Sequence, residues 1–176
     1  EPEIQRISNI LDDKGNWDKR LGALKALHSI VIADISTKRN FQPVMSSTLK
    51  ITLKAQVEDL RSAISREACA VVRALVACSE NKNNWEYMSA WFLQSLFNNS
   101  CATVQIISQN ADETLRCIAA CGYISRNAML TFLKNCAQKH SVIRRNAFQC
   151  LLLILQNCDP SVSQRHTTQI CRMRSR

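Results

Sequence analysis

The sequence predicts an all-α solenoid built from helical pairs, and three observations support this fold class. Two segments, Ser62–Cys69 and Ser141–Phe148, carry Ser, Ile, Arg and Ala at matching places, and a degraded copy lies midway near Ala102–Ile106. The spacing of these copies is about 40 residues, the period of helical pairs of the HEAT type. Gly and Pro occur only three times each in 176 residues, which favours long helices over hairpins. No segment alternates apolar and polar residues as a half-buried strand would.

The first two helical pairs follow from apolar residues spaced three and four apart. Their apolar stripes run over residues 4–11, 17–35, 45–57 and 64–78. The polar run Asp12–Gly15 separates the first two helices, and Asn16 is the expected N-cap of the second. Pro43 suits the first turn of the third helix. The polar stretch 36–40 links the two pairs.

The third and fourth pairs show the same pattern. Their apolar stripes run over residues 85–96, 102–122, 127–137 and 147–155. Gly122 is the expected residue just beyond a helix C-terminus. The five apolar residues Leu151–Leu155 predict a buried helix face, because a membrane span needs about 18 apolar residues.

A further helix is expected to begin at Pro160 and to carry Val162 and Ile170. We therefore predict about four helical pairs plus a terminal helix. Residues 1–159 form the repeat domain, and residues 160–176 form a partial fifth repeat with a basic end.

The net charge of +9 points to an acidic partner, whether nucleic acid, an anionic membrane or an acidic protein. Part of the charge is local, since four arginines and no acidic residue follow Asp159. Charge alone does not choose among these partners.

Nothing in the sequence predicts catalysis or a cofactor. The three histidines lie in different repeats, no glycine-rich phosphate loop occurs, and acidic residues are scattered singly. The nine cysteines include no Cys-x-x-Cys pair, so we expect neither a metal site nor disulfides. They fit small apolar filler between helices in a reducing compartment. We expect no enzyme activity and no small-molecule substrate.

The turns inside the pairs are expected to line up along one edge of the stack, a natural binding surface. The predicted turns are Asp12–Trp17, Glu58–Ser62, Asn98–Cys101 and Gln138–Ser141. The first carries Lys14 and Trp17 with Lys19 and Arg20 just behind it, and the third has no charge.

The second predicted turn carries Arg61, with Arg66 one helical turn later. The fourth carries Lys139 and His140, followed by Arg144 and Arg145. Trp17 also fits the apolar phase of its helix, so both a core role and a contact role stay open. Arg66 and Arg145 occupy equivalent positions inside helices and fit a structural role as well as an exposed one.

Three of these segments resemble TOG domains. The run Asn16–Leu24 resembles the W-x-x-R-x-x-A-L opening of that family. Leu60–Cys69 resembles the second repeat of CLASP-type TOG domains, and Ser141–Phe148 resembles their fourth repeat. The crescerin (TOGARAM) group of ciliary TOG proteins is similar in the same way, and the sequence does not separate the two groups.

This resemblance implies tubulin or microtubule binding through the edge formed by the turns. The family pattern carries over to Trp17 in the first turn, to Ser62 and Ala63 in the second, and to Lys139 and Arg144 in the fourth. Together with the neighbouring lysines, the candidate tubulin-binding residues are Trp17, Lys14, Lys19, Ser62, Ala63, Lys139 and Arg144.

The leading hypothesis is therefore a non-catalytic, monomeric module of a cytoskeletal regulator. It would act in the cytoplasm on the cytoskeleton, with the cilium or centrosome as candidate places. The alternative is a HEAT-type adaptor for a different acidic protein. Nucleic-acid binding through the same basic edge is a third and less favoured class, and membrane binding is not expected.

Overall fold

The computed structural model describes residues 2–33, 45–77 and 90–157. These residues form eight α-helices and one short π-helix, and no strand occurs within these three ranges. The predicted all-α fold is thereby confirmed.

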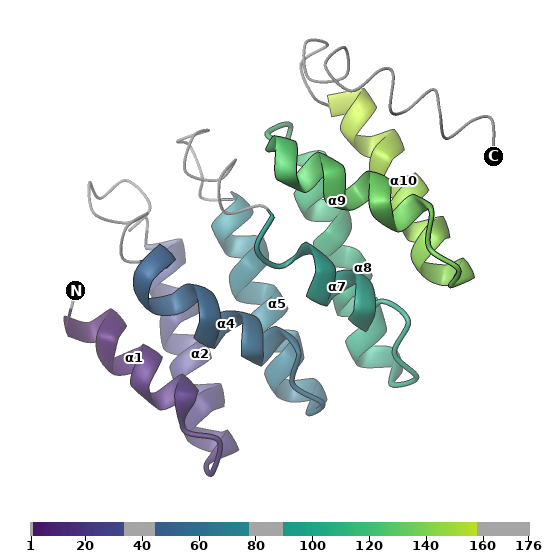
Figure 1. Cartoon of the computed structure of the whole chain (residues 1–176). Helices are drawn as coiled ribbons and strands as arrows, with labels where there is room; N and C mark the ends of the chain where they lie inside the picture. The colour runs from purple at the N-terminus through teal and green to yellow at the C-terminus, as the bar shows by residue number, and fades with distance from the viewer. Residues whose placement is uncertain (1, 34–44, 78–89, 158–176) are drawn as a thin grey trace.

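The helices follow one another as four antiparallel pairs (Figure 1). The first pair is α1 (Pro2–Asp12) with α2 (Trp17–Ile32), and the second is the π-helix η2 (Met45–Leu49) and α4 (Lys50–Val57) with α5 (Ser62–Ala77). The third pair is α7 (Leu93–Asn99) with α8 (Gln105–Ala120), and the fourth is α9 (Arg126–Cys136) with α10 (Ser141–Asn157).

The pairs stack side by side to give two layers. The first helices of the pairs, α1, α4, α7 and α9, form one layer, and the second helices, α2, α5, α8 and α10, form the other (Figure 1). Each second helix packs against its own partner and against the second helix of a neighbouring pair. This arrangement is a HEAT-like solenoid, as the repeat period predicts.

Local signals set several helix ends, two of them, at Asn16 and Gly122, where the sequence predicts them. The Asn16 side chain caps α2, because its Oδ1 accepts a hydrogen bond from the backbone N–H of Lys19 at 3.1 Å. Ser125 caps α9 in the same way, accepting from the backbone N–H of Ala128. Gly122 follows the end of α8 with φ of 79°, the left-handed conformation that favours glycine.

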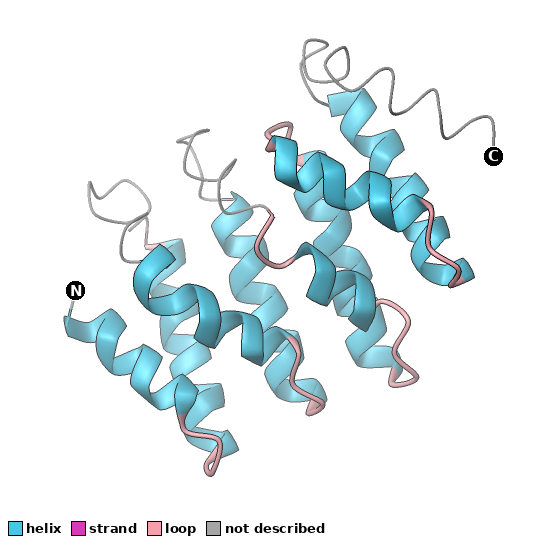
Figure 2. Cartoon of the chain, viewed as in Figure 1, coloured by secondary structure: helices cyan, strands magenta, loops and turns pink. Residues whose placement is uncertain are grey.

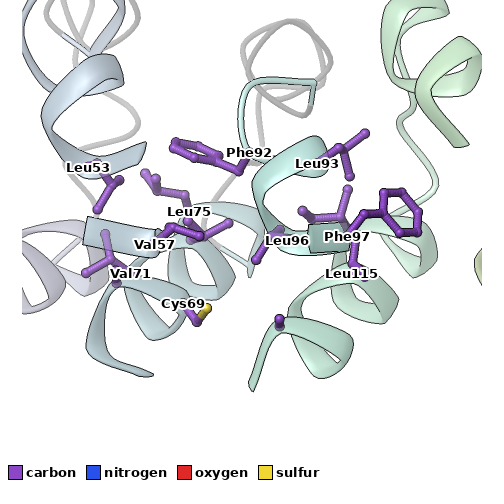
Figure 3. Packing of buried hydrophobic residues seen from close by; sticks show 14 of the residues in the cluster. Leu53, Val57, Cys69, Val71, Leu75, Phe92, Leu93, Leu96, Phe97 and Leu115 are labelled. Carbon is purple, nitrogen blue, oxygen red and sulfur yellow. The ribbon is translucent and has the colours of Figure 1, made fainter. Parts of the chain in front are cut away.

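One continuous apolar core runs through the stack from Ile4 to Ile154. Figure 3 shows side chains of α4, α5, α7 and α8 meeting in its central part. The rings of Phe97 and Phe132 join α7 to α9, with centroids 5.7 Å apart in an edge-to-face arrangement. Fully burying one such side chain contributes roughly 1.5–3 kcal/mol, so the core accounts for most of the attraction between pairs.

Polar contacts also join each pair to the next along the second layer. They link α2 to α5, α5 to α8, and α8 to α10 in turn. The contacts are His28 Nδ1 to Glu67 Oε1 at 3.3 Å, Arg73 Nη1 to Thr114 Oγ1 at 2.9 Å, and Arg116 Nη2 to Gln149 Oε1 at 2.6 Å.

The predicted burial of the whole run Leu151–Leu155 is wrong. Leu151 and Ile154 are buried, whereas Leu152 is 56% exposed and Leu155 is 46% exposed. The reason is that α10 packs mainly on α8 and α9 and less on α7, and its remaining face is exposed. The predicted terminal segment 160–176, and the parts of the predicted helices within 34–44 and 78–89, lie outside the described residues.

Candidate functional site

The four turns inside the pairs lie along one edge of the stack (Figure 2). We call this row the turn edge, and it comprises residues 13–16, 58–61, 100–104 and 137–140. The third turn lies later than the predicted Asn98–Cys101, because α7 continues to Asn99 and α8 begins only at Gln105. The turn edge is where the predicted binding residues gather.

Trp17 is the first residue of α2 and is 45% exposed. The structure therefore places this indole at the surface of the turn edge and not in the core, although it keeps the apolar phase of its helix. Lys14 and Lys19 are exposed on either side of it. A large aromatic side chain that is half exposed at a helix terminus is a suitable anchor for a protein partner.

Arg20 does not belong to the exposed cations of the first turn, and the prediction that it brings charge to the edge is wrong. Only 4% of its side chain is exposed. Its Nη1 donates to Gln56 Oε1 at 2.7 Å and to Asp59 Oδ2 at 2.8 Å. These acceptors belong to the second pair, so the guanidinium is used between the pairs.

The second turn exposes a large apolar residue that sequence reasoning missed. Leu60 is 89% exposed, beside the exposed Arg61, whereas Ser62 and Ala63 are half-buried at the start of α5. Leu60 lies inside the predicted turn Glu58–Ser62, where only the cation Arg61 was counted toward the binding surface. The position of Leu60 before the first helical residue was the available signal.

The third turn also presents aliphatic side chains. Val104 is 46% exposed and Ile106 is 45% exposed. Starting the predicted helix at Ala102 placed both residues inside it, which is why they were missed. Residues 100–104 carry no charged side chain, as predicted.

The fourth turn is basic. Lys139 and His140 are exposed, and Arg144 is exposed on the first turn of α10. The Nη1 of Arg144 donates to the backbone carbonyls of Gln138 at 2.9 Å and Lys139 at 3.2 Å. Arg144 therefore supports the turn while leaving part of its guanidinium at the surface.

Arg66 and Arg145, for which a structural role stayed open, are both exposed. Arg145 makes a long hydrogen bond of 3.4 Å to the neighbouring Asn146 side chain. The arginine that holds the fourth turn is thus Arg144 and not Arg145.

Charge is unevenly distributed along the turn edge. In the first turn, the exposed acids Asp12, Asp13 and Asp18 offset the two lysines. In the fourth turn, no acidic residue accompanies the cations. The turn edge therefore changes from apolar side chains at its first three turns to positive charge at its fourth.

The described residues offer little for chemistry. They contain no group of three or more His, Cys, Asp or Glu side chains that could hold a metal ion. No helix among them is both long and apolar enough to cross a membrane. The arrangement at the turn edge is one that a macromolecular partner would contact.

Comparison with known proteins identifies the family. The CLASP N-terminal family matches residues 1–130. The chain is 28% identical over 169 residues to CLIP-associating protein 1-B of Xenopus laevis, and 27% identical over the same length to CLIP-associating protein 1 of Xenopus tropicalis. An uncharacterized protein of Dictyostelium discoideum is 26% identical over 161 residues.

These matches cover most of this chain but little of its relatives. The two Xenopus matches cover 96% of the chain and 11% of each relative, and the Dictyostelium match covers 88% of the chain and 19% of that protein. Because the family matches more than half of the chain, the resemblance to CLASP-type TOG domains is confirmed, and the chain belongs to the CLASP N-terminal family.

Proposed function

We propose that this chain is a non-catalytic module that binds tubulin or microtubules through its turn edge. The family membership and the resemblance of three repeats to TOG domains support this function. We also propose that it works as a monomer in the cytoplasm, as part of a regulator of the cytoskeleton. The single observation that carries the proposal is the half-exposed Trp17 at the start of α2.

The proposed contact surface has an apolar part and a basic part. Trp17 and Leu60, which we call the apolar anchors, supply the apolar part, and Ser62 and Ala63 border it on α5. The basic part is the fourth turn with Lys139 and Arg144. Lys14 and Lys19 flank the indole of Trp17 and complete the set.

The direct test is binding of purified tubulin to the chain and to edge variants. We expect Trp17→Ala to weaken binding by about 2 kcal/mol or more, because an interface anchor of this size is usually desolvated on binding. We expect Lys139→Glu to weaken binding through charge, without unfolding the domain. Arg144→Glu should weaken binding through charge and through loss of its two hydrogen bonds to the fourth turn, also without unfolding the domain. Co-elution in size-exclusion chromatography and a titration of fluorescently labelled tubulin measure both effects.

Matched controls lie away from the turn edge. Ile51 is 79% exposed near the start of α4, and Arg126 is exposed at the start of α9. Ile51→Ala removes an exposed apolar side chain and Arg126→Glu reverses an exposed charge, so neither should change tubulin affinity by more than about twofold.

Two outcomes would contradict the proposal. If Trp17→Ala lowers the melting temperature sharply, the indole is a structural residue and not a contact. If the edge variants stay folded and bind tubulin as tightly as the unchanged chain, the turn edge is not the tubulin site. A HEAT-type adaptor for another acidic protein would then be the better description.

A further inference from the structure

A buried ion pair joins the start of α2 to the second turn, close along the chain to both apolar anchors. Arg20 follows Trp17 by one helical turn in α2, and Asp59 immediately precedes Leu60. The Arg20 Nη1 and Asp59 Oδ2 atoms are 2.8 Å apart, and the two side chains are 4% and 10% exposed. Arg20 and Asp59 are therefore each within one helical turn of an anchor along the chain.

The pair also fixes the backbone on both sides of the second turn. The other carboxylate oxygen of Asp59 accepts a hydrogen bond from the backbone N–H of Arg61 at 2.8 Å. Leu60 lies between these two residues, so this hydrogen bond spans the residue that carries the anchor. Aspartate commonly holds a turn in this way.

On the other side, Arg20 reaches the end of the first helix through Gln56. The Gln56 side chain is 2% exposed, accepts from Arg20, and donates through Nε2 to the backbone carbonyl of Leu11 at 2.9 Å. Leu11 is at the end of α1, just before the first turn. A single guanidinium thus connects the end of α1, the end of α4 and the second turn.

The chemistry of the pair is not what stability alone would select. The Nε of Arg20 is buried without a hydrogen-bond partner, and an unsatisfied buried donor is unfavourable. Replacing a buried ion pair by apolar residues of similar volume is often neutral or stabilising. What the pair supplies, and an apolar contact would not, is a fixed direction and distance between two turns.

We propose that Arg20 and Asp59 are positioning residues that hold Trp17 and Leu60 at a fixed separation for the binding partner. This inference rests on the proposed function of the turn edge. A surface arranged before binding loses less conformational entropy on association, so its anchors contribute more to affinity. The pair acts through the anchors and does not itself touch the partner.

The test compares Asp59→Asn in two backgrounds, because a purely structural role would act equally in both. In the unchanged chain, we expect this substitution to weaken tubulin binding at least tenfold at a temperature well below melting. In the Trp17→Ala, Leu60→Ala background, no anchors remain to be positioned, and the same substitution should weaken binding less than twofold. Equal losses in the two backgrounds, or no loss in the unchanged chain, would overturn the inference.

A second readout does not depend on tubulin. Amide hydrogen exchange, followed by mass spectrometry, should rise in Asp59→Asn across both the first and second turns and stay unchanged in α8. Unchanged exchange at the first turn would count against the positioning role. If exchange rises as expected but the unchanged chain does not bind tubulin, the proposed function fails while the connection between the turns stands.

A matched control and a second variant complete the design. Asp112 pairs with Arg116 at 2.9 Å within α8, away from the turn edge, so Asp112→Asn should leave tubulin affinity unchanged. Should Asp59→Asn fail to fold, Arg20→Lys replaces it. A lysine keeps the charge but lacks the planar fork that reaches two acceptors, and the same difference between backgrounds is expected.

Discussion

At the scale of single residues, one position of the repeat carries a hydrogen-bond donor near each turn. In the second helix of each pair, a side-chain donor stands three residues before a buried alanine. This donor makes a hydrogen bond to an atom in or beside a turn. The four donors are Arg20, Ser65, Ser108 and Arg144. Ser65 donates to the carbonyl of Val57 in its own pair, whereas Arg20 bonds to the next pair.

The repeat pattern of the sequence points instead to the next position, Arg66 and Arg145, because the partners of this one are not visible in the sequence. Arg20 looks like an exposed cation in the sequence because its acceptors lie 36 and 39 residues further along the chain. Its burial depends on how two pairs stack, which no local pattern encodes.

Trp17 fits both a core and a surface position by its helical phase. It is exposed because it is the first residue of α2, directly after the turn.

Acid should weaken the fold through Asp59. Burial raises the pKa of this carboxyl, but the backbone N–H of Arg61 and the guanidinium of Arg20 outweigh it, so the pKa lies below its ordinary value of 3.8. The stabilisation is then complete above the unfolded pKa and is lost as pH falls through the lower folded pKa. Urea unfolding between about pH 7 and pH 3 should show a steeper loss for the unchanged chain than for Asp59→Asn. Parallel curves would contradict this assignment.

The buried cysteines should resist thiol reagents in the folded protein. Burial raises the pKa of Cys136 to about 12, and burial followed by the nearby Asp112 carboxylate raises the pKa of Cys150 to about 12. The reactive thiolate is then a very small fraction at pH 8, roughly one part in ten thousand. Pulsed alkylation and peptide mapping should show Cys101, which is partly exposed, labelled long before either. Early labelling of Cys150 would contradict the described packing.

At the scale of helices, the sequence predicts the position of a helix terminus well only where a capping residue is present. Asn16 and Gly122 are such residues, and both ends fall where they predict. The third turn, Ser100–Val104, contains neither Gly nor Pro, so its limits were misplaced and Val104 was assigned to a helix. The outward face of α10 was mispredicted for another reason, because a run of leucines does not show how many neighbouring helices cover it.

The two glycines next to or within helices should respond to alanine in opposite directions. Gly122 has φ of 79°, and a Cβ there would lie 3.1 Å from the backbone oxygen of Asn157, so Gly122→Ala should destabilise the fold by about 1–2 kcal/mol. Gly22 lies within α2 with nothing within 4 Å of an added Cβ. Gly22→Ala should therefore stabilise by about 0.5–1 kcal/mol. Urea denaturation of both variants measures the difference, and a shift of the same sign for both would refute the argument.

At the scale of the whole molecule, the repeat period was sufficient to predict the stack. A period of about 40 residues with two apolar stripes per repeat leaves each pair only one way to bury its faces, namely against the next pair. The charge distribution of the turn edge was harder to predict from the sequence than the stack. It depends on Arg20 leaving the surface, which is a property of the assembled edge. It also depends on Asp12, Asp13 and Asp18, which stand beside the lysines of the first turn in the sequence and were not set against them in the prediction.

This unequal charge distribution predicts how salt should affect tubulin binding. Exposed charges are screened over about 10 Å at 0.1 M salt, whereas a desolvated apolar contact is affected little. Raising salt from about 50 to about 200 mM should therefore weaken the unchanged chain, mainly through the fourth turn, which has cations and no acids. Lys139→Glu should flatten this dependence.

Trp17→Ala should behave differently in the same titration. It should lower affinity at every salt concentration and leave the slope against salt unchanged, because it removes an apolar anchor and no charge. Ile51→Ala, the exposed apolar control on α4, should change neither affinity nor slope. If Trp17→Ala flattens the slope while Lys139→Glu leaves it intact, the basic end of the turn edge does not face the acidic partner, and the contact must lie around the lysines of the first turn.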